Sequence, residues 1–233
     1  MNKFIVLDLE TTGVKYSDEI LQVSIIDDKK QTLFSEYIKP DKHTTWEEAQ
    51  KVNKITPETV KNCNNLLFYK DKLLQILQNT ESIVGYNIKF DIKFLERALN
   101  WKCNIPLYDV MLEFAKLTLY KRDDIGFRFK LTQVCDALDI DLSNAHDALA
   151  DTIGTYDCYV KMQELFKKPK LNTIYKFPDG KEIYSEHLAK AYANKCGSQW
   201  VSTYYLVDGK RQDTIDDISK YNSASFIKPG AVN

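Results

Sequence analysis

The chain carries the stretch F-I-V-L-D-L-E-T-T-G at residues 4–13. Its apolar start and its Thr-Thr-Gly ending predict a buried strand over Phe4–Glu10. Side chains two residues apart leave a strand on the same face, so Asp8 and Glu10 project together, and the neighbouring leucines face the other side. Two carboxylates about 4 Å apart repel by roughly 4 kcal/mol at an effective dielectric constant of 20, and a divalent cation removes that cost. Taken alone, however, a D-x-E pair is more typical of a solvated strand edge, so a metal site requires further acids.

Three more candidates follow along the chain. Asp91 lies in G-Y-N-I-K-F-D, near the start of a helix predicted over Lys89–Leu99, with Asn87 as its N-cap. His146 and Asp151 lie in H-D-A-L-A-D, and they face one site if His146 precedes a helix and Asp151 lies one turn into it. Each of these residues, taken singly, is more typical of a structural or surface position. Together, four carboxylates and one histidine supply what two-metal phosphoryl transfer requires.

The surrounding pattern predicts an α/β fold. Further strands are expected at Ile20–Asp27, Thr32–Ile38 and Ser82–Tyr86, and further helices at Leu66–Gln78, Val110–Leu119, Leu131–Leu138 and Asp147–Phe166. We expect Asp109 to cap the helix that follows it rather than to bind a metal, and Asp147 or Asn144 to cap the last helix.

A domain boundary is expected at the linker Lys167–Lys170, because a helix does not readily continue through its proline and the charges favour solvent. Residues 1–167 then form the domain that carries the acidic motifs, and residues 172–233 form a small α+β module of unknown role. In this module, Asp179-Gly180 and Asp208-Gly209 predict hairpin turns.

The amino-acid composition limits the classes of protein to which the chain can belong. Of the 233 residues, 44% are hydrophobic and 28% are charged, which is typical of a globular protein without a membrane span. The net charge of −1 does not by itself indicate a nucleic-acid partner. The five cysteines are widely spaced and include no C-x-x-C pair, which favours reduced thiols and a cytoplasmic location.

Taken together, the motifs resemble those of the DEDDh, or DnaQ-like, 3′→5′ exonucleases, a family that includes the proofreading subunits of bacterial replicative DNA polymerases. The resemblance covers roughly residues 4–165 and follows the motif order of the family. It implies a ribonuclease-H-like fold, a five-stranded mixed sheet flanked by helices. It also implies that the metal-binding acids are Asp8, Glu10, Asp91 and Asp151, and that the general base is His146.

The resemblance further implies a two-metal mechanism with Mg²⁺ or Mn²⁺. The expected activity is removal of nucleoside 5′-monophosphates from the 3′ end of single-stranded or frayed DNA. Thr11 and Thr12 are candidate contacts to the 3′ end, or simply a strand-to-loop turn, and Asn87 is a further candidate contact. Many relatives carry H-G-I-T where this chain has N-K-I-T at Asn53–Thr56. Ile55 is still expected to pack against a terminal base, without the histidine.

Two alternatives stay open. A 3′ exoribonuclease of the same family fits the same motifs, and a catalytically silent scaffold subunit would keep the fold, although no expected ligand is missing. The expected partner is a single-stranded nucleic-acid end, with DNA favoured over RNA. A polymerase or another replication or repair protein is a candidate partner for residues 172–233.

Overall fold

The computed structural model describes residues 1–117, 129–142, 147–167, 170–183, 186–200, 202–207, 210–214 and 222–223. The chain forms two compact units, the first comprising Met1–Val160 and the second beginning at Lys161. Within the described ranges, none of the helices combines the length and the apolar character that crossing a membrane requires.

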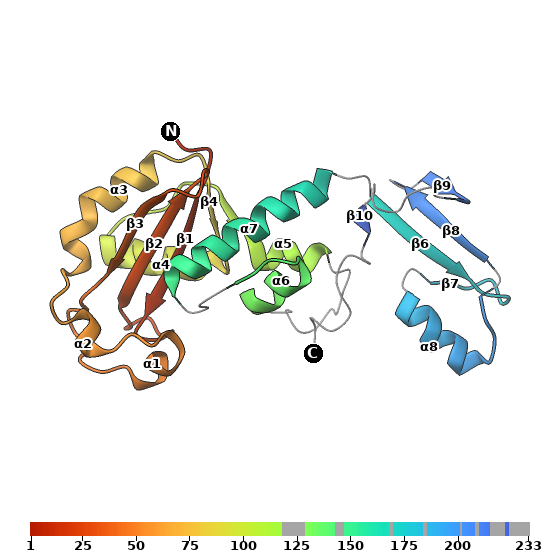
Figure 1. Ribbon diagram of the computed structural model, residues 1–233, viewed down its shortest axis with the longest axis horizontal. Helices are drawn as coiled ribbons and strands as arrows, with labels where there is room; N and C mark the ends of the chain where they lie inside the picture. The colour runs from red at the N-terminus through yellow and green to blue at the C-terminus, as the bar shows by residue number, and fades with distance from the viewer. Residues whose placement is uncertain are drawn as a thin grey trace. The chain divides into compact units, whose positions relative to one another are not determined.

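The first unit is built on a five-stranded sheet with the strand order β3-β2-β1-β4-β5 (Figure 1). Its strands are β1 (Ile5–Thr11), β2 (Ile20–Asp27), β3 (Thr32–Tyr37), β4 (Ile83–Gly85) and β5 (Leu107–Asp109). The pairs β1–β2 and β2–β3 are antiparallel, whereas β1–β4 and β4–β5 are parallel. The predicted five-stranded mixed sheet is therefore confirmed, and the four strands predicted from the sequence agree to within one residue at each end.

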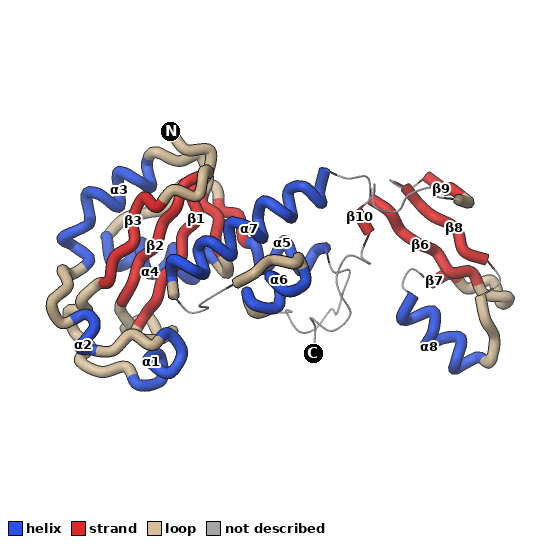
Figure 2. Tube along the Cα trace, viewed as in Figure 1, coloured by secondary structure: helices blue, strands red, loops and turns tan. Residues whose placement is uncertain are grey.

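Helices cover both faces of this sheet (Figure 2). Helices α3 (Lys70–Gln78) and α4 (Ile88–Leu99) share a hydrophobic core with the apolar face of β1. Helix α7 (Ala148–Lys167) packs on the opposite face. The other helices of this unit are α1 (Glu47–Asn53), α2 (Pro57–Val60), α5 (Val110–Leu117) and α6 (Leu131–Ala137).

The helical segment predicted over Leu66–Gln78 is confirmed, but only Lys70–Gln78 is the α-helix α3, and the first four residues form a 3₁₀ turn, η1 (Leu66–Tyr69). The side chain of Asn65 accepts the backbone N–H of Phe68 at 3.2 Å and closes this tight turn. A 3₁₀ turn places residues three apart on one side, as an α-helix nearly does, so the apolar periodicity could not separate the two.

The pairing of β1 with β2 shifts by one residue immediately after Glu10. Glu10 pairs with Gln22. Thr11 then pairs with Ile20, so Leu21 is the extra residue of a β-bulge. The bulged residue packs in a small buried cluster with Trp46, Ile55 and Val60. The bulge therefore packs the start of β2, opposite the end of β1, against the α1–α2 segment.

Asp109 lies at the junction of β5 and α5 and caps that helix, as predicted. Its Oδ1 atom accepts the backbone N–H groups of Met111 at 3.1 Å and Leu112 at 3.3 Å. The same oxygen accepts the N–H of Asn87 at 3.1 Å. One carboxylate therefore ties the start of α5 to the loop that leads from β4 into α4.

The second unit is an α+β structure with its own five-stranded sheet, ordered β10-β6-β8-β9 with β7 paired to β6. Its elements are β6 (Lys170–Lys176), β7 (Glu182–Ile183), α8 (Glu186–Cys196), β8 (Ser202–Val207), β9 (Lys210–Gln212) and β10 (Asn222–Ser223). The predicted linker Lys167–Lys170 is too long, because its first residue ends α7 and its last pairs with β10 in the sheet.

The hairpin predicted at Asp179-Gly180 is confirmed. Gly180 has a φ of 84°, and its N–H donates to the carbonyl of Phe177 at 3.0 Å. The dipeptide Asp208-Gly209 lies outside the described residues, and the strands on either side of it, β8 and β9, pair antiparallel.

We expect Asp109→Ala to lower the free energy of unfolding by about 1–3 kcal/mol, because three backbone N–H groups near the sheet lose their acceptor. Urea denaturation followed by circular dichroism measures this change. Asp71→Ala is the matched control, since Asp71 is an exposed aspartate in the first turn of α3. A loss for Asp109→Ala no larger than that for the control would contradict the role of Asp109.

Candidate active site

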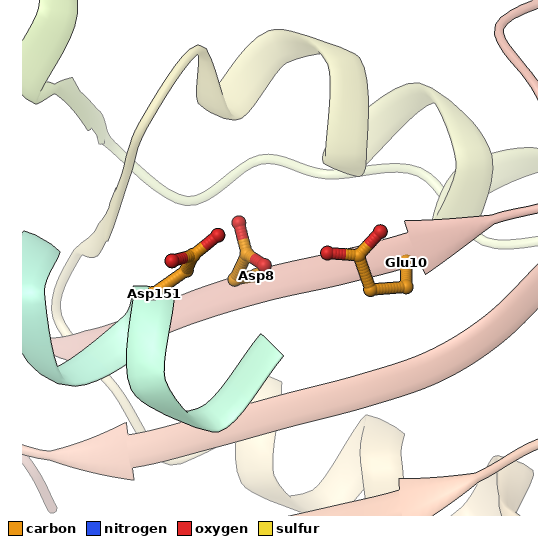
Figure 3. A group of neighbouring side chains, drawn as sticks. All are labelled: Asp8, Glu10 and Asp151. Atoms are coloured by element: carbon orange, nitrogen blue, oxygen red, sulfur yellow. The ribbon is translucent and has the colours of Figure 1, made fainter. Parts of the chain in front are cut away.

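Asp8 and Glu10 project from β1 on one face of the sheet, and Leu7 and Leu9 lie on the other face in the hydrophobic core. Figure 3 shows both carboxylates beside Asp151 of α7. One carboxylate oxygen from each of these three acids lies within 4.8 Å of the other two. Two segments far apart in the sequence therefore meet in one acidic cluster.

The position of Asp151 depends on how α7 begins. Asp147 caps this helix, since its Oδ1 accepts the N–H groups of Leu149 and Ala150 at 3.1 Å each. Asp151 lies one turn further on, and its N–H donates to the carbonyl of Asp147 at 2.9 Å. Of the two caps considered from the sequence, Asp147 is thus confirmed, and Asn144 lies outside the described residues.

Gln22 in β2 anchors this start of α7 to the sheet. Its Nε2 donates to Oδ2 of Asp147 at 3.3 Å, and its Oε1 accepts the N–H of Ala148 at 3.3 Å. Gln22 is buried and pairs with Glu10 in the sheet, so one amide sets the helix start beside a candidate ligand. Gln22 is not among the site residues predicted from the sequence. The sequence does contain an indication of a buried polar group here, because Gln22 interrupts the otherwise mostly apolar strand I-L-Q-V-S-I-I.

Asp91 lies in the first turn of α4 and is 3% exposed. Burial raises the pKa of Asp91 well above its usual range, hydrogen bonds from its own N–H and that of Leu9 lower it, and the charge of Glu10 raises it further. Asp91 in turn is the largest cause, after burial, of a raised pKa at Asp8. Asp91 is therefore close enough to act electrostatically on both acids of β1.

Asn87 occupies the N-cap position of α4, but the predicted side-chain cap is wrong. Its backbone is left-handed, with φ 57° and ψ 39°, and its side chain makes no capping hydrogen bond. A capping side chain reaches the first turn from an extended backbone, and the left-handed conformation directs it elsewhere. A contact between Asn87 and substrate stays a prediction.

The acids of β1 repel one another and their neighbours. Burial raises the pKa of Asp8 well above its usual range, and the surrounding carboxylates raise it further, in decreasing order Asp91, Glu10, Asp151 and Asp147. Burial also raises the pKa of Glu10 to about 7, against a hydrogen bond from Asn53 that lowers it. Near neutral pH, then, a proton competes with any cation for these oxygens.

The donor set fits a hard divalent cation. All the candidate ligands are carboxylates, which are the donors that Mg²⁺ and Mn²⁺ prefer. In the part of the chain that the structure describes, none of the ion pairs involves Asp8, Glu10 or Asp91. Their mutual repulsion therefore has no compensating lysine or arginine there, and a bound cation would supply the missing positive charge.

The remaining predicted site residues differ in how the structure places them. Thr11 and Thr12 are both buried at the end of β1, where the Thr11 hydroxyl donates to the carbonyl of Gly13 at 2.7 Å. Ile55 is 3% exposed and belongs to the buried cluster around the bulge. His146 lies outside the described residues. The roles of these four residues stay predictions.

The fold and the cluster together define a class of protein. A five-stranded mixed sheet with a carboxylate pair on its central strand is the architecture of ribonuclease-H-like nucleases, the fold class predicted from the sequence. Residues 5–159 match a family model described as exonuclease (RNase T), so the chain belongs to this exonuclease family, and its resemblance to the DEDDh exonucleases is confirmed.

Two known proteins are similar in sequence to most of this chain. A PolC-type DNA polymerase III of Caldanaerobacter subterraneus subsp. tengcongensis is 22% identical over 176 residues, which cover 74% of this chain and 12% of that protein. The 3′-5′ exonuclease DinG of Staphylococcus haemolyticus is 26% identical over 192 residues, which cover 73% of this chain and 19% of that protein. The chain thus spans less than a fifth of either relative.

The fold has counterparts among solved structures. The crystal structure of cell-death related nuclease 4 superposes with a TM-score of 0.55 at 16% identity, over 74% of this chain and 67% of that one. At this identity the likeness is one of fold.

The raised pKa values predict how the stability of the metal-free protein depends on pH. Protonation favours the folded state where the folded pKa is the higher one, so stability falls as pH rises from about 4.5 to about 7 for Glu10. Asp8 and Asp91 act in the same direction. We expect Asp8→Asn to be no less stable than the wild type in a chelator at pH 8, because it removes one repelling charge.

Thermal unfolding at pH 5, 6, 7 and 8, with chelator or with Mg²⁺, measures this effect. Mg²⁺ should raise the melting temperature of the wild type mainly at the higher pH values. In chelator, the melting temperature of Asp8→Asn should change less with pH than that of the wild type. Identical pH slopes for the two metal-free proteins would show that the acids do not repel as described.

Proposed function

We propose that the protein is a metal-dependent 3′→5′ exonuclease that acts on single-stranded or frayed DNA ends and releases nucleoside 5′-monophosphates. The observation that carries the proposal is the acidic cluster of Asp8, Glu10 and Asp151, with one oxygen of each within 4.8 Å of the others. Membership of the exonuclease family supports phosphodiester hydrolysis as its chemistry.

In this proposal Asp8, Glu10, Asp91 and Asp151 would hold two Mg²⁺ or Mn²⁺ ions. The ions, when bound, would lower the pKa of the attacking water and stabilise charge on the leaving 3′ oxygen. The chain itself contributes the placement of the acids. The strand β1 fixes Asp8 and Glu10 on one face, and Gln22 holds the start of α7 so that Asp151 faces them.

His146 would accept the proton of the attacking water. This assignment rests on the motif H-D-A-L-A-D, in which His146 precedes Asp151 by five residues, as in the DEDDh exonucleases. A neutral imidazole suits this task, because the ordinary pKa of histidine lies near the working pH.

The 3′ end of the substrate would be gripped at the carboxyl end of β1. The hydroxyl of Thr12 accepts the N–H of Glu19 at 2.9 Å and keeps its own hydrogen to donate. The hydroxyl of Thr11 already donates to Gly13. We therefore assign a side-chain contact with the terminal nucleotide to Thr12, and only a backbone contact to Thr11. Ile55 and Asn87 stay in the proposal as further contacts.

The DNA preference, the partner and the location are also proposals. The PolC-type relative carries its matching segment within a DNA polymerase, which supports DNA as the substrate and a replication or repair protein as a partner of residues 172–233. We retain the cytoplasmic location that the cysteine pattern predicts. RNA is the principal alternative substrate, and the assay below separates it from DNA.

Incubation with 5′-labelled single-stranded DNA, RNA of the same sequence and a 3′-mismatched duplex tests the activity. With Mg²⁺ or Mn²⁺ we expect a ladder that shortens from the 3′ end, fastest on single-stranded DNA, and no shortening in a chelator. Asp8→Asn should abolish the ladder, whereas Asp136→Asn, a change at an exposed acid on α6, should leave it intact. A faster ladder on RNA would make the protein an exoribonuclease, and no ladder with metal bound would support a silent scaffold.

We expect His146→Ala to slow the reaction by roughly 10²–10⁴-fold, the usual contribution of a general base, while leaving the affinity for Mn²⁺ within a few-fold of the wild type. Single-turnover kinetics and calorimetric titration with Mn²⁺ measure the two quantities. A comparable loss of metal affinity would instead indicate that His146 is a ligand.

A further inference from the structure

Asn53, the last residue of α1, is a buried polar side chain at the edge of the acidic cluster. It is 6% exposed. Its Nδ2 donates to the carbonyl of Thr11 at 3.2 Å, and its Oδ1 accepts the N–H of Ile55 at 3.1 Å. The same side chain lies close enough to the carboxylate of Glu10 to lower the pKa of that acid. One amide therefore bonds to the residue after a candidate ligand and to the start of the segment that follows α1.

These contacts require an amide in one orientation. The NH₂ group has two hydrogens. One is donated to the carbonyl of Thr11, and the other is left for the carboxylate of Glu10, whose pKa this side chain lowers. The amide oxygen accepts the N–H of Ile55. A flipped amide would set oxygen against oxygen at Thr11. An aspartate could not donate to the carbonyl of Thr11, and a leucine could make neither bond.

The backbone around Asn53 holds the side chain in place. Lys54 has a left-handed backbone, with φ 61° and ψ 6°, and its N–H donates to the carbonyl of Gln50, which closes α1. The chain then turns back to Ile55, whose carbonyl accepts the indole N–H of Trp46 at 2.7 Å. Trp46 and Ile55 lie in the buried cluster that also holds the bulged Leu21 of β2. The contacts of its own segment therefore hold the Asn53 amide in position independently of Glu10.

We propose that Asn53 is a positioning residue of the metal site, which orients the Glu10 carboxylate and holds the backbone of Thr11 through a single amide. The proposal rests on the function proposed above, because it takes Glu10 to be a metal ligand. Hydrogen bonds to ligating carboxylates fix their orientation, and losing such a partner weakens metal binding by roughly 10- to 100-fold. Asn53 also links Glu10 to the strand end that would meet the terminal nucleotide.

Calorimetric titration of the 233-residue chain with Mn²⁺ tests this role without any substrate. We expect Asn53→Ala and Asn53→Leu to weaken Mn²⁺ binding at least about tenfold. Trp46→Phe is the matched control, because it removes a hydrogen bond to the same Ile55 backbone and leaves the Asn53 contacts in place. It should lower the melting temperature while keeping Mn²⁺ affinity within about twofold of the wild type. A purely structural role for Asn53 would make all three variants behave alike.

A measurement on the unaltered protein covers the case in which the Asn53 variants do not fold. In nuclear magnetic resonance spectra of the ¹⁵N-labelled wild type, the side-chain NH₂ signals of Asn53 should shift during titration with Mg²⁺. The midpoint of this shift should occur at the same Mg²⁺ concentration as the midpoint of metal binding.

Three results would each overturn the positioning role without affecting the proposed function. They are an unchanged Mn²⁺ affinity in Asn53→Ala and Asn53→Leu, an equal loss of Mn²⁺ affinity in Trp46→Phe, and Asn53 NH₂ signals that do not shift when Mg²⁺ is added. A wild type that binds neither ion would remove the metal site, and with it both this inference and the proposed function.

Discussion

The repulsion among buried carboxylates is the constraint on which this structure depends. Asp8, Glu10 and Asp91 share a small region of the first unit, and burial and mutual charge both raise the pKa values of these acids. A protein gains nothing in stability from such an arrangement without a counter-charge, because desolvation and like-charge repulsion act in the same direction. A bound cation would supply that counter-charge, and the surrounding fold is the apparatus that holds the acids together against their repulsion.

That apparatus consists of one strand with two different faces and two buried amides. The leucines of β1 anchor it in the hydrophobic core, so its acids are held rigidly on the other face. Gln22 brings the start of α7 to this face, and Asn53 brings the end of α1 to the edge of it. Neutral amides suit this position, since they donate to carboxylates and carbonyls without adding a charge that would change the affinity for cations.

The sequence predicted the parts of this site that follow from local periodicity. The alternation in F-I-V-L-D-L-E placed Asp8 and Glu10 on one face. The motif H-D-A-L-A-D placed Asp151 one turn into a helix capped by Asp147 or Asn144, and Asp147 is the cap. Contacts between distant segments could not be predicted in this way. Nothing local to Gln22 or Asn53 identifies the partners of these residues, which lie on other elements. Asparagine adopts the left-handed backbone more readily than most residues, but nothing in the sequence indicates that Asn87 does so here.

The β-bulge that follows Glu10 has an evolutionary consequence. Because β1 and β2 stay in register up to Glu10 and shift only beyond it, the connection between the strands can change in length without moving either acid. Changes of length in residues 13–18, in the loop between β1 and β2, are then absorbed beyond Glu10. In the proposed nuclease, this loop could differ between relatives while the spacing of Asp8 and Glu10 stays constant, and exchanging it would offer a way to alter substrate choice without rebuilding the acidic cluster.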